Sequence, residues 1–500
     1  MNPHLRRSIP LLTLTFTAAA ALLAGCKVGP NYQRPGMDVP EQWLSATRPS
    51  APMGWWANFN DPQLDSLIRR AVVANLDLRL AGSRIAEARA LRTSAGSSLY
   101  PAVNTSGRYT RSRSSENLFS GGGGGDSSSG GSTTGGFALP GEQSDLFAVG
   151  FDASWEIDLW GRVRRGVEAA DADLQASIEG RRDAMVSVMA EVARNYVELR
   201  AFQKRLAITR ENVEAQEKTL RLVEGRARAG VDRDFDVVRQ RALVNTTTSQ
   251  IPLLEGAIRQ TQYQLAVLLG RTPGELIAEL SPRELPRLPE AVPAGLPSDL
   301  LRRRADIRRA ERELAAATAR VGVATADLFP RISLTGSLGL QSDEFKNLFQ
   351  GASRAWSIGP SVFWPLFDAG RIRANIAIQN ARQEQALIGY QRSVLIALQD
   401  VESALIGYAK EQERRKVLGE AVTNNQRAVS LANERYQAGL ESLISVLDAQ
   451  RQLFAAQDSL VQSDRAVAEN LVALYKALGG GWEDVEQREM RERQEQPAPR

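Results

Sequence analysis

Histidine and cysteine, the residue types used most often for metal binding, proton transfer and nucleophilic catalysis, are nearly missing from this chain. Its 500 residues include one histidine and one cysteine. The histidine, His4, lies in an N-terminal leader, so the rest of the chain has no imidazole for a metal site or a catalytic triad. The cysteine, Cys26, has no partner for an internal disulfide. We therefore expect no enzyme activity, no cofactor and no bound metal.

The charge balance gives no sign of a nucleic-acid partner. Lysine and arginine total 62, aspartate and glutamate total 58, and 43% of the residues are hydrophobic. The small basic excess is spread along the chain and forms no dense basic block. We expect a large folded protein that does not bind nucleic acid.

The N-terminus has the pattern of an export signal. Basic residues precede a short apolar core, Ile9–Ala21, which is too short to span a bilayer comfortably. The segment L-A-G-C at Leu23–Cys26 is similar to the bacterial lipoprotein signal, whose cysteine is lipidated; a free cysteine after an ordinary signal is the alternative. Because Lys27 rather than aspartate follows, the lipoprotein sorting rule favours the outer membrane. We predict a signal peptide over 1–25, lipidation at Cys26 and a lipid-anchored segment over 26–60.

The body of the chain contains one plan twice. The segment W-E-I-D-L-W-G-R-V-R begins at Trp155 and W-P-L-F-D-A-G-R-I-R begins at Trp364, an offset of 364 − 155 = 209. Each is followed by a proline-free helical stretch that stops at an A-G pair, and Gly439 and Gly230 differ by the same 209. Each copy predicts one long helix, and a helix over Arg162–Arg228 would span roughly 100 Å.

Beyond each A-G pair the chain returns as a second helix. We predict these return helices over Asp234–Leu269 and Ser442–Leu478, with a kink or break near Pro252 in the first. Upstream, Asn75–Pro101 aligns with Arg304–Pro330. The predicted domains are a first repeat over 61–270, a proline-rich equatorial linker over 271–298, a second repeat over 299–481 and a disordered tail over 482–500.

Segments with alternating polar and apolar residues precede both long helices. Apolar residues alternate with serine, threonine and glycine over Ile332–Gln341 and Trp356–Leu366, and over Phe147–Ile157; the strand near Val103–Arg111 is the weakest. Strands of about ten residues with period two suit a transmembrane β-strand, although a soluble hairpin would show the same pattern. The glycine- and serine-rich tract Gly121–Gly136 between the first two strands predicts a flexible loop.

Four strands cannot close a barrel wide enough to conduct, and hydrocarbon does not tolerate open sheet edges. Two copies would give eight strands, a barrel usually filled by its own side chains, whereas three give twelve and can leave a lumen. We therefore predict a mainly α fold with a small membrane β-barrel: a long helical coiled-coil barrel from two repeats, and four strands per chain that close a twelve-stranded barrel in a homotrimer.

A family resemblance rests on four stretches. They are C-K-V-G-P-N-Y-Q-R-P at Cys26–Pro35, W-W-A-N-F-N-D-P-Q-L at Trp55–Leu64, L-P-S-D-L-L-R-R-R-A-D-I-R-R-A-E at Leu296–Glu311 and G-P-S-V-F-W-P-L-F-D-A-G-R-I-R-A-N at Gly359–Asn375. Together they resemble the outer-membrane efflux lipoproteins of the TolC and OprM type, the NodT family, which are the exit ducts of tripartite resistance-nodulation-division pumps. The resemblance covers nearly all of the chain after the leader.

The resemblance implies where the functional residues lie. It places a periplasmic gate just inside the second turn, at Ile444, Asp448 and Arg451. From spacing alone, Asp448 and Arg451 could equally be a solvated i,i+3 ion pair. The resemblance also implies adaptor-binding tips at Ala229, Gly230, Val231, Ala438, Gly439, Leu440 and Ser442.

The function that we expect is passive conduction in the outer membrane of a bacterium, with the helical barrel in the periplasm. The implied partners are two further copies, a periplasmic adaptor protein, an inner-membrane resistance-nodulation-division transporter and outer-membrane lipid. Two alternatives stay open: a lipid-anchored periplasmic coiled-coil scaffold without a pore, and a TolC-type exit for a secreted molecule.

Overall fold

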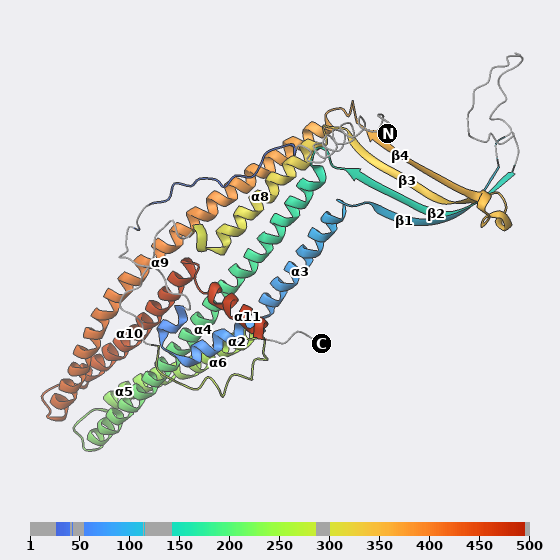
Figure 1. Ribbon diagram of the computed structural model, residues 1–500. Helices are drawn as coiled ribbons and strands as arrows, with labels where there is room; N and C mark the ends of the chain where they lie inside the picture. Colours follow the sequence, from blue (N-terminus) through green and yellow to red (C-terminus); the bar gives the residue numbers. More distant parts are fainter. Residues whose placement is uncertain are drawn as a thin grey trace, which may run out of the picture. The chain divides into compact units, whose positions relative to one another are not determined.

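The computed structural model describes residues 27–40, 43, 55–113, 115, 143–286 and 301–495. The signal peptide over 1–25, Cys26, the tract Gly121–Gly136, the linker beyond residue 286 and the end of the tail lie outside these ranges. The described chain is mainly helical with one four-stranded sheet (Figure 1), which confirms the predicted fold class.

The helices and strands follow the order expected from the repeats. The first repeat runs through η2 (Trp55–Phe59), α2 (Pro62–Ala74), α3 (Leu76–Ser97), β1 (Ala102–Arg113), β2 (Gln143–Ile157), α4 (Arg162–Arg228), α5 (Asp234–Thr248) and α6 (Gln250–Leu268). The second runs through α8 (Ala305–Ala326), β3 (Arg331–Ser342), η3 (Phe345–Asn347), η4 (Gly351–Ser353), β4 (Arg354–Phe363), α9 (Arg371–Gln437) and α10 (Leu443–Ala477), and α11 (Trp482–Glu495) follows. No helix within the described ranges combines the length and apolar character needed to cross a bilayer.

The chain forms two compact units, and each repeat contributes to both. One unit takes residues up to Gln33, Arg89–Ala172 and Ala315–Gln385, and the other takes the remainder. The long helices α4 and α9 therefore each pass from one unit to the other.

The sheet belongs to the first unit. Its strands pair antiparallel in the order β1-β2-β3-β4, so β1 and β4 are its edges. The register places Val149 opposite Leu340 and Phe151 opposite Leu338. Because side chains alternate between faces, these apolar residues share one face, and Asp152 opposite Ser337 lies on the other. The sequence alternation therefore becomes one apolar and one polar sheet face.

The N-terminal segment is tied to the start of α4 in the same unit. The side chain of Arg165 is buried and donates to the carbonyl of Val28 at 3.3 Å and to Asn31 Oδ1 at 2.7 Å. The backbone N–H of Val28 donates to the carbonyl of Trp160 at 3.1 Å. Hydrogen bonds thus hold the segment after Cys26 against the start of α4, which the sequence did not reveal.

The second unit holds the main hydrophobic core. Met185, Tyr196 and neighbouring residues of α4 pack against α2, α6 and α10. Tyr475 of α10 stacks on Trp55 with ring centroids 5.2 Å apart. Asp61 caps α2, as its sequence predicts: its Oδ1 accepts the N–H of Gln63 at 2.9 Å.

The return helices differ as predicted. In the first repeat α5 ends at Thr248 and α6 begins at Gln250, whereas α10 is continuous over 35 residues. The cause is Pro252, whose ring clashes with the carbonyl four residues earlier, which belongs to Thr248.

The disordered tail is a wrong prediction for most of its length. Helix α11 occupies Trp482–Glu495, and the Trp482 ring is buried in the main core. Glu486 accepts from Arg182 of α4 through both of its oxygens, each at 2.8 Å. The many charges of the tail suggested a solvated segment, but an ion pair and one tryptophan hold it on α4.

Candidate functional site

The two long helices end in the same kind of turn. In the first repeat Gly230 adopts φ +75°, and in the second Gly439 adopts φ +74°. The N–H of Val231 donates to the carbonyl of Arg226 at 2.9 Å, and that of Leu440 to Arg435 at 2.8 Å. This is a helix stop that needs a left-handed residue just past the helix end, which glycine adopts at least cost. The A-G pairs therefore encode the two tips.

Each tip presents an apolar side chain to solvent. Val231 is 63% exposed and Leu440 is 69% exposed. These residues are equivalent in the two repeats, since 440 − 231 = 209. The predicted tip residues Ala229, Gly230, Val231, Ala438, Gly439, Leu440 and Ser442 all lie in these two turns.

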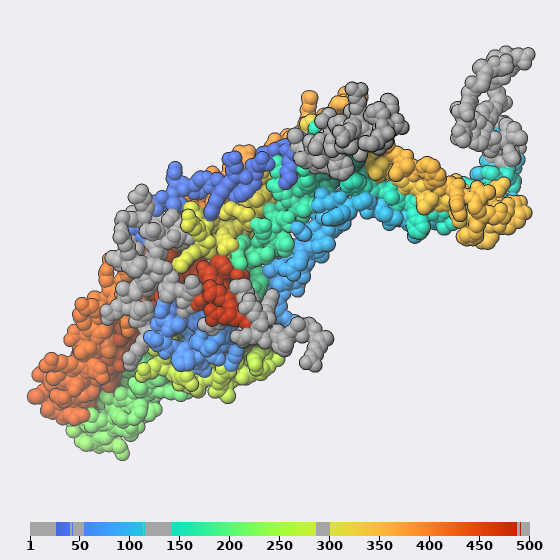
Figure 2. Space-filling view, viewed as in Figure 1, coloured from blue at the N-terminus to red at the C-terminus, as the bar shows by residue number. Residues whose placement is uncertain are grey.

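A charged clasp joins the two tips of one chain, which lie side by side (Figures 1 and 2). The Tyr436 hydroxyl at the end of α9 donates to Asp232 in the first tip. Arg226 at the end of α4 pairs with the same carboxylate at 2.9 Å, and its guanidinium lies 4.7 Å from the Tyr436 ring centre. Burial and the hydrogen bond to Asp232 raise the pKa of Tyr436, so it stays a hydrogen-bond donor.

Sequence reasoning missed this clasp, because its hydrogen bond joins residues 204 positions apart in the chain. The only available signal was the pair of polar residues, Arg226 and Asp232, that flanks the first A-G turn. A small apolar core lies behind the clasp. It contains Val223, Leu243, Tyr436, Leu443, Val446 and Leu447.

The predicted gate residues share the opposite face of α10. Leu443, Val446 and Leu447 are buried, while Ile444, Asp448 and Arg451 are exposed. The structure thus brings the three predicted residues onto one solvent-facing side, at spacings of one and two helical turns. Within the described part of the chain neither Asp448 nor Arg451 forms an ion pair, so the i,i+3 pair considered from spacing is not made.

The first repeat carries different chemistry at the same place. Subtracting 209 from 444 and 448 gives Phe235 and Arg239 of α5. Phe235 is 61% exposed, and the Arg239 guanidinium lies 5.3 Å from its ring centre. One tip of the chain therefore offers an acidic side chain near its end, and the other offers a basic one.

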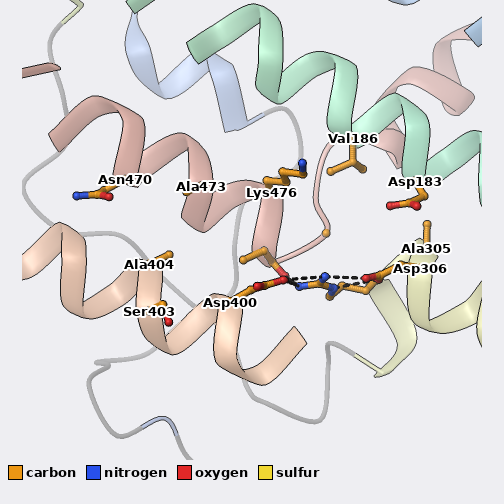
Figure 3. Close-up of a pocket in the computed structure, with 13 residues that line it drawn as sticks. Asp183, Val186, Ala305, Asp306, Asp400, Ser403, Ala404, Asn470, Ala473 and Lys476 are labelled. Carbon is orange, nitrogen blue, oxygen red and sulfur yellow. Dashed lines mark hydrogen bonds and ion pairs between the residues drawn. The ribbon is translucent and has the colours of Figure 1, made fainter. Parts of the chain in front are cut away.

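A second cluster of charges lies where α8, α9 and α10 meet (Figure 3). Arg304 bridges Asp306 at 2.7 Å and Asp400 at 3.1 Å, and donates to the carbonyl of Ala477 at 3.0 Å. Burial acts to raise the pKa of Asp306, but Arg304 lowers it overall. The cluster borders a cavity of about 410 Å³ that is also lined by Asp183 and Lys476.

This cluster has the features of a structural joint. Its cationic groups are Arg304 and Lys476, against the carboxylates of Asp183, Asp306 and Asp400. The Arg304 donors are used within the chain, where they tie the start of α8 to α9 and to the end of α10. Across the described residues no group of histidine, cysteine, aspartate or glutamate is arranged to hold a metal ion.

Comparison with known proteins gives a consistent result. The family model described as "Outer membrane efflux protein" matches residues 67–271 and 296–480. The pyoverdine export outer membrane protein OpmQ of Pseudomonas aeruginosa is 36% identical, with 95% of this chain and 98% of that protein covered. Nodulation protein T of Rhizobium leguminosarum bv. trifolii is 32% identical, with 93% and 96% covered.

The fold comparison agrees. A solved structure of the outer-membrane channel OprN superposes with a TM-score of 0.83 at 36% sequence identity, and the match covers 91% of this chain and all of that one. The two segments of the family model correspond closely to the two repeats read from the sequence.

Proposed function

Because this chain belongs to the outer membrane efflux protein family, we propose that it is the exit duct of a tripartite efflux pump. It conducts passively, and an inner-membrane resistance-nodulation-division transporter with a periplasmic adaptor delivers its substrates. The observation that carries this proposal is the duplicated unit of two strands, a long helix and a return helix, found in a chain that matches channel proteins over nearly its whole length. Nothing in this function requires a chemical step.

The conducting form is a homotrimer. The free edges of β1 and β4 leave unpaired backbone groups, which hydrocarbon does not tolerate. Pairing β4 of one copy with β1 of the next satisfies both edges, and three copies give twelve strands with room for a lumen. The apolar face with Phe151 and Leu338 then meets lipid, and the face with Asp152 and Ser337 meets water.

The gate lies at the tips. Ile444, Asp448 and Arg451 face away from the core of their own chain, so three copies can bring them around one axis. Three Asp448 carboxylates near that axis repel one another, which favours opening. Within each chain the clasp of Tyr436, Asp232 and Arg226 ties the second tip to the first, which limits how far that tip can move. The adaptor opens the gate only if it binds the open arrangement more tightly than the closed one.

The adaptor binds the exposed tips. Val231 and Leu440 give it two equivalent apolar contacts per chain, and the turns hold them in fixed geometry. A lipidated Cys26 would insert in outer-membrane lipid as an anchor. The hydrogen bonds from Arg165 fix the chain only two residues beyond that cysteine.

The second candidate function is the exit of a secreted molecule. The relative OpmQ is named for pyoverdine export, and a Pseudomonas putida relative, TtgC, for toluene efflux. A secreted small molecule is therefore as consistent with the family as a toxic compound.

Conductance tests the proposal. The purified lipoprotein, shown to be trimeric by mass photometry, is added to planar lipid bilayers. We expect discrete single-channel steps of small amplitude. A folded trimer that inserts and never conducts would contradict the duct and favour a scaffold.

A further inference from the structure

A cavity in the second unit is lined mainly by arginine. Its volume is about 540 Å³, and it lies between the N-terminal segment, α4 and α8. Arginines outnumber carboxylates among its lining residues by five to two. The arginines are Arg34, Arg182, Arg302, Arg308 and Arg312, and the carboxylates are Glu179 and Glu311.

The two carboxylates do not form ion pairs with all five arginines. Glu179 pairs with Arg182 at 2.7 Å and with Arg308 at 2.6 Å. Glu311 pairs with Arg34 at 3.3 Å and with Arg312. Arg302 is exposed and makes no ion pair within the described ranges. A guanidinium has five N–H donors, so those of Arg302 are available to a ligand.

Two of the arginines are held in place before any ligand binds. The Trp482 ring lies under two of them, 4.3 Å from Arg182 and 5.4 Å from Arg308. Glu486 of the same helix fixes the other side of Arg182. Fixed guanidinium groups lose little freedom on binding an anion, and their planar forks suit phosphate and carboxylate oxygens.

One wall atom adds selectivity. The Glu179 side chain is 8% exposed, and its Oε2 is buried without a hydrogen-bond partner. A buried carboxylate oxygen without a partner costs free energy that a donor can recover. An anion that also carries a hydroxyl proton would satisfy the arginines and this oxygen together.

We propose that this cavity is a binding site for a small oxyanion of the hydrogen phosphate class, independent of conduction. Arg302, Arg34 and Arg308 supply the positive charge, and Glu179 favours an oxyanion that carries a proton. Bound there, the anion would connect the N-terminal segment to α4 and α8 within this unit.

Isothermal titration calorimetry on the full-length protein in detergent tests the site, with inorganic phosphate as the probe at fixed ionic strength. We expect one site per chain. Arg302→Gln should weaken binding about tenfold, because one charge-assisted hydrogen bond is lost. Arg34→Gln, from a different segment of the wall, should act in the same direction.

Two controls make the test decisive. Lys476→Gln removes a cationic group from the neighbouring cavity at Arg304 and should leave phosphate binding unchanged. Sulfate, which has no proton to donate to Glu179, should bind several-fold more weakly than phosphate. No measurable phosphate binding, equal losses from Arg302→Gln and Lys476→Gln, or sulfate binding as tight as phosphate would each overturn the assignment.

Discussion

The two repeats of this chain share a scaffold and differ where charge matters. Helices α4 and α9 each contain 67 residues and stand exactly 209 positions apart, since 371 − 162 = 209. The indole N–H of Trp155 donates to the carbonyl of Leu99 at 3.0 Å, and that of Trp364 donates to Leu328 at the same distance. Duplication has kept the length of the long helices, the turns at their ends and these backbone contacts, so changes between the repeats point to added roles.

The clearest change is in the side chain that hydrogen-bonds to the C-terminal end of each return helix. Asn75 donates to the carbonyl of Leu268 at 2.9 Å in the first repeat, and Arg304 donates to Ala477 at 3.0 Å in the second. The acceptors are equivalent, since 477 − 268 = 209. Only the arginine also reaches carboxylates, Asp306 and Asp400. A neutral hydrogen bond from Asn75 in the first repeat therefore corresponds to the charged cluster around Arg304 in the second.

The largest loss of stability should come from placing a proline in the continuous return helix α10. Val461 is the equivalent of Pro252, since 461 − 252 = 209, and it is 3% exposed in continuous α10. Val461→Pro should lower the free energy of unfolding by about 3 kcal/mol or more, because it removes a helix hydrogen bond and clashes with the preceding turn. Pro252→Ala, the matched change, should cost nothing. Denaturant unfolding followed by circular dichroism measures both, and equal effects would contradict the comparison.

Removing the side chains that bond to the ends of the return helices should give the next largest loss of stability. Arg304→Met should destabilise the protein by about 2 kcal/mol, because Asp306 and Asp400 lose a partly buried partner. Asn75→Ala should cost between about 1 and 2 kcal/mol, because it removes the hydrogen bond to Leu268 and the cap that Asn75 Oδ1 gives to the N–H groups of Asp77 and Leu78. The unfolding midpoints of the two variants decide the order. A larger loss for Asn75→Ala than for Arg304→Met would contradict this order.

The tip clasp should give a smaller stability change and a clear functional one. Tyr436→Phe removes the hydrogen bond to Asp232 and should cost about 1 kcal/mol while loosening the tips. Faster trypsin cleavage near Arg226 and Arg228 would report that loosening. Glu441→Gln is the matched control, because Glu441 is equivalent to Asp232 but its pair with Arg435 spans 3.8 Å and has no tyrosine. Equal cleavage rates in the two variants would argue against the clasp.

The sequence predicted much of this molecule because its main signals are local. Proline-free stretches that end in A-G defined α4 and α9, period-two alternation defined the strands, and Pro252 defined the broken return helix. The clasp of Tyr436 with Asp232, the seat of the N-terminal segment on Arg165 and the packing of Trp482 were not predicted. Each joins residues that are more than 100 positions apart, and no periodicity in one sequence reports such a contact.

The position of the gate residues could be predicted from the sequence, but their role could not. The helix face that carries Ile444, Asp448 and Arg451 follows from their spacing, and the structure leaves that face exposed. Their role came from family resemblance and stays a proposal, because it depends on contacts between copies of the chain.

Single-channel conductance of three proteins decides whether this chain forms a gated duct: wild type, Asp448→Ala, and Arg239→Ala at the equivalent first-repeat position. We predict a small wild-type conductance that rises in Asp448→Ala, because the smaller alanine side chains widen the constriction more than the loss of carboxylate repulsion narrows it. Arg239→Ala should change the conductance less, because the proposed gate residues belong to the second repeat. Conductance unaltered by Asp448→Ala would remove the gate assignment, and no conductance from any of the three would contradict the duct itself.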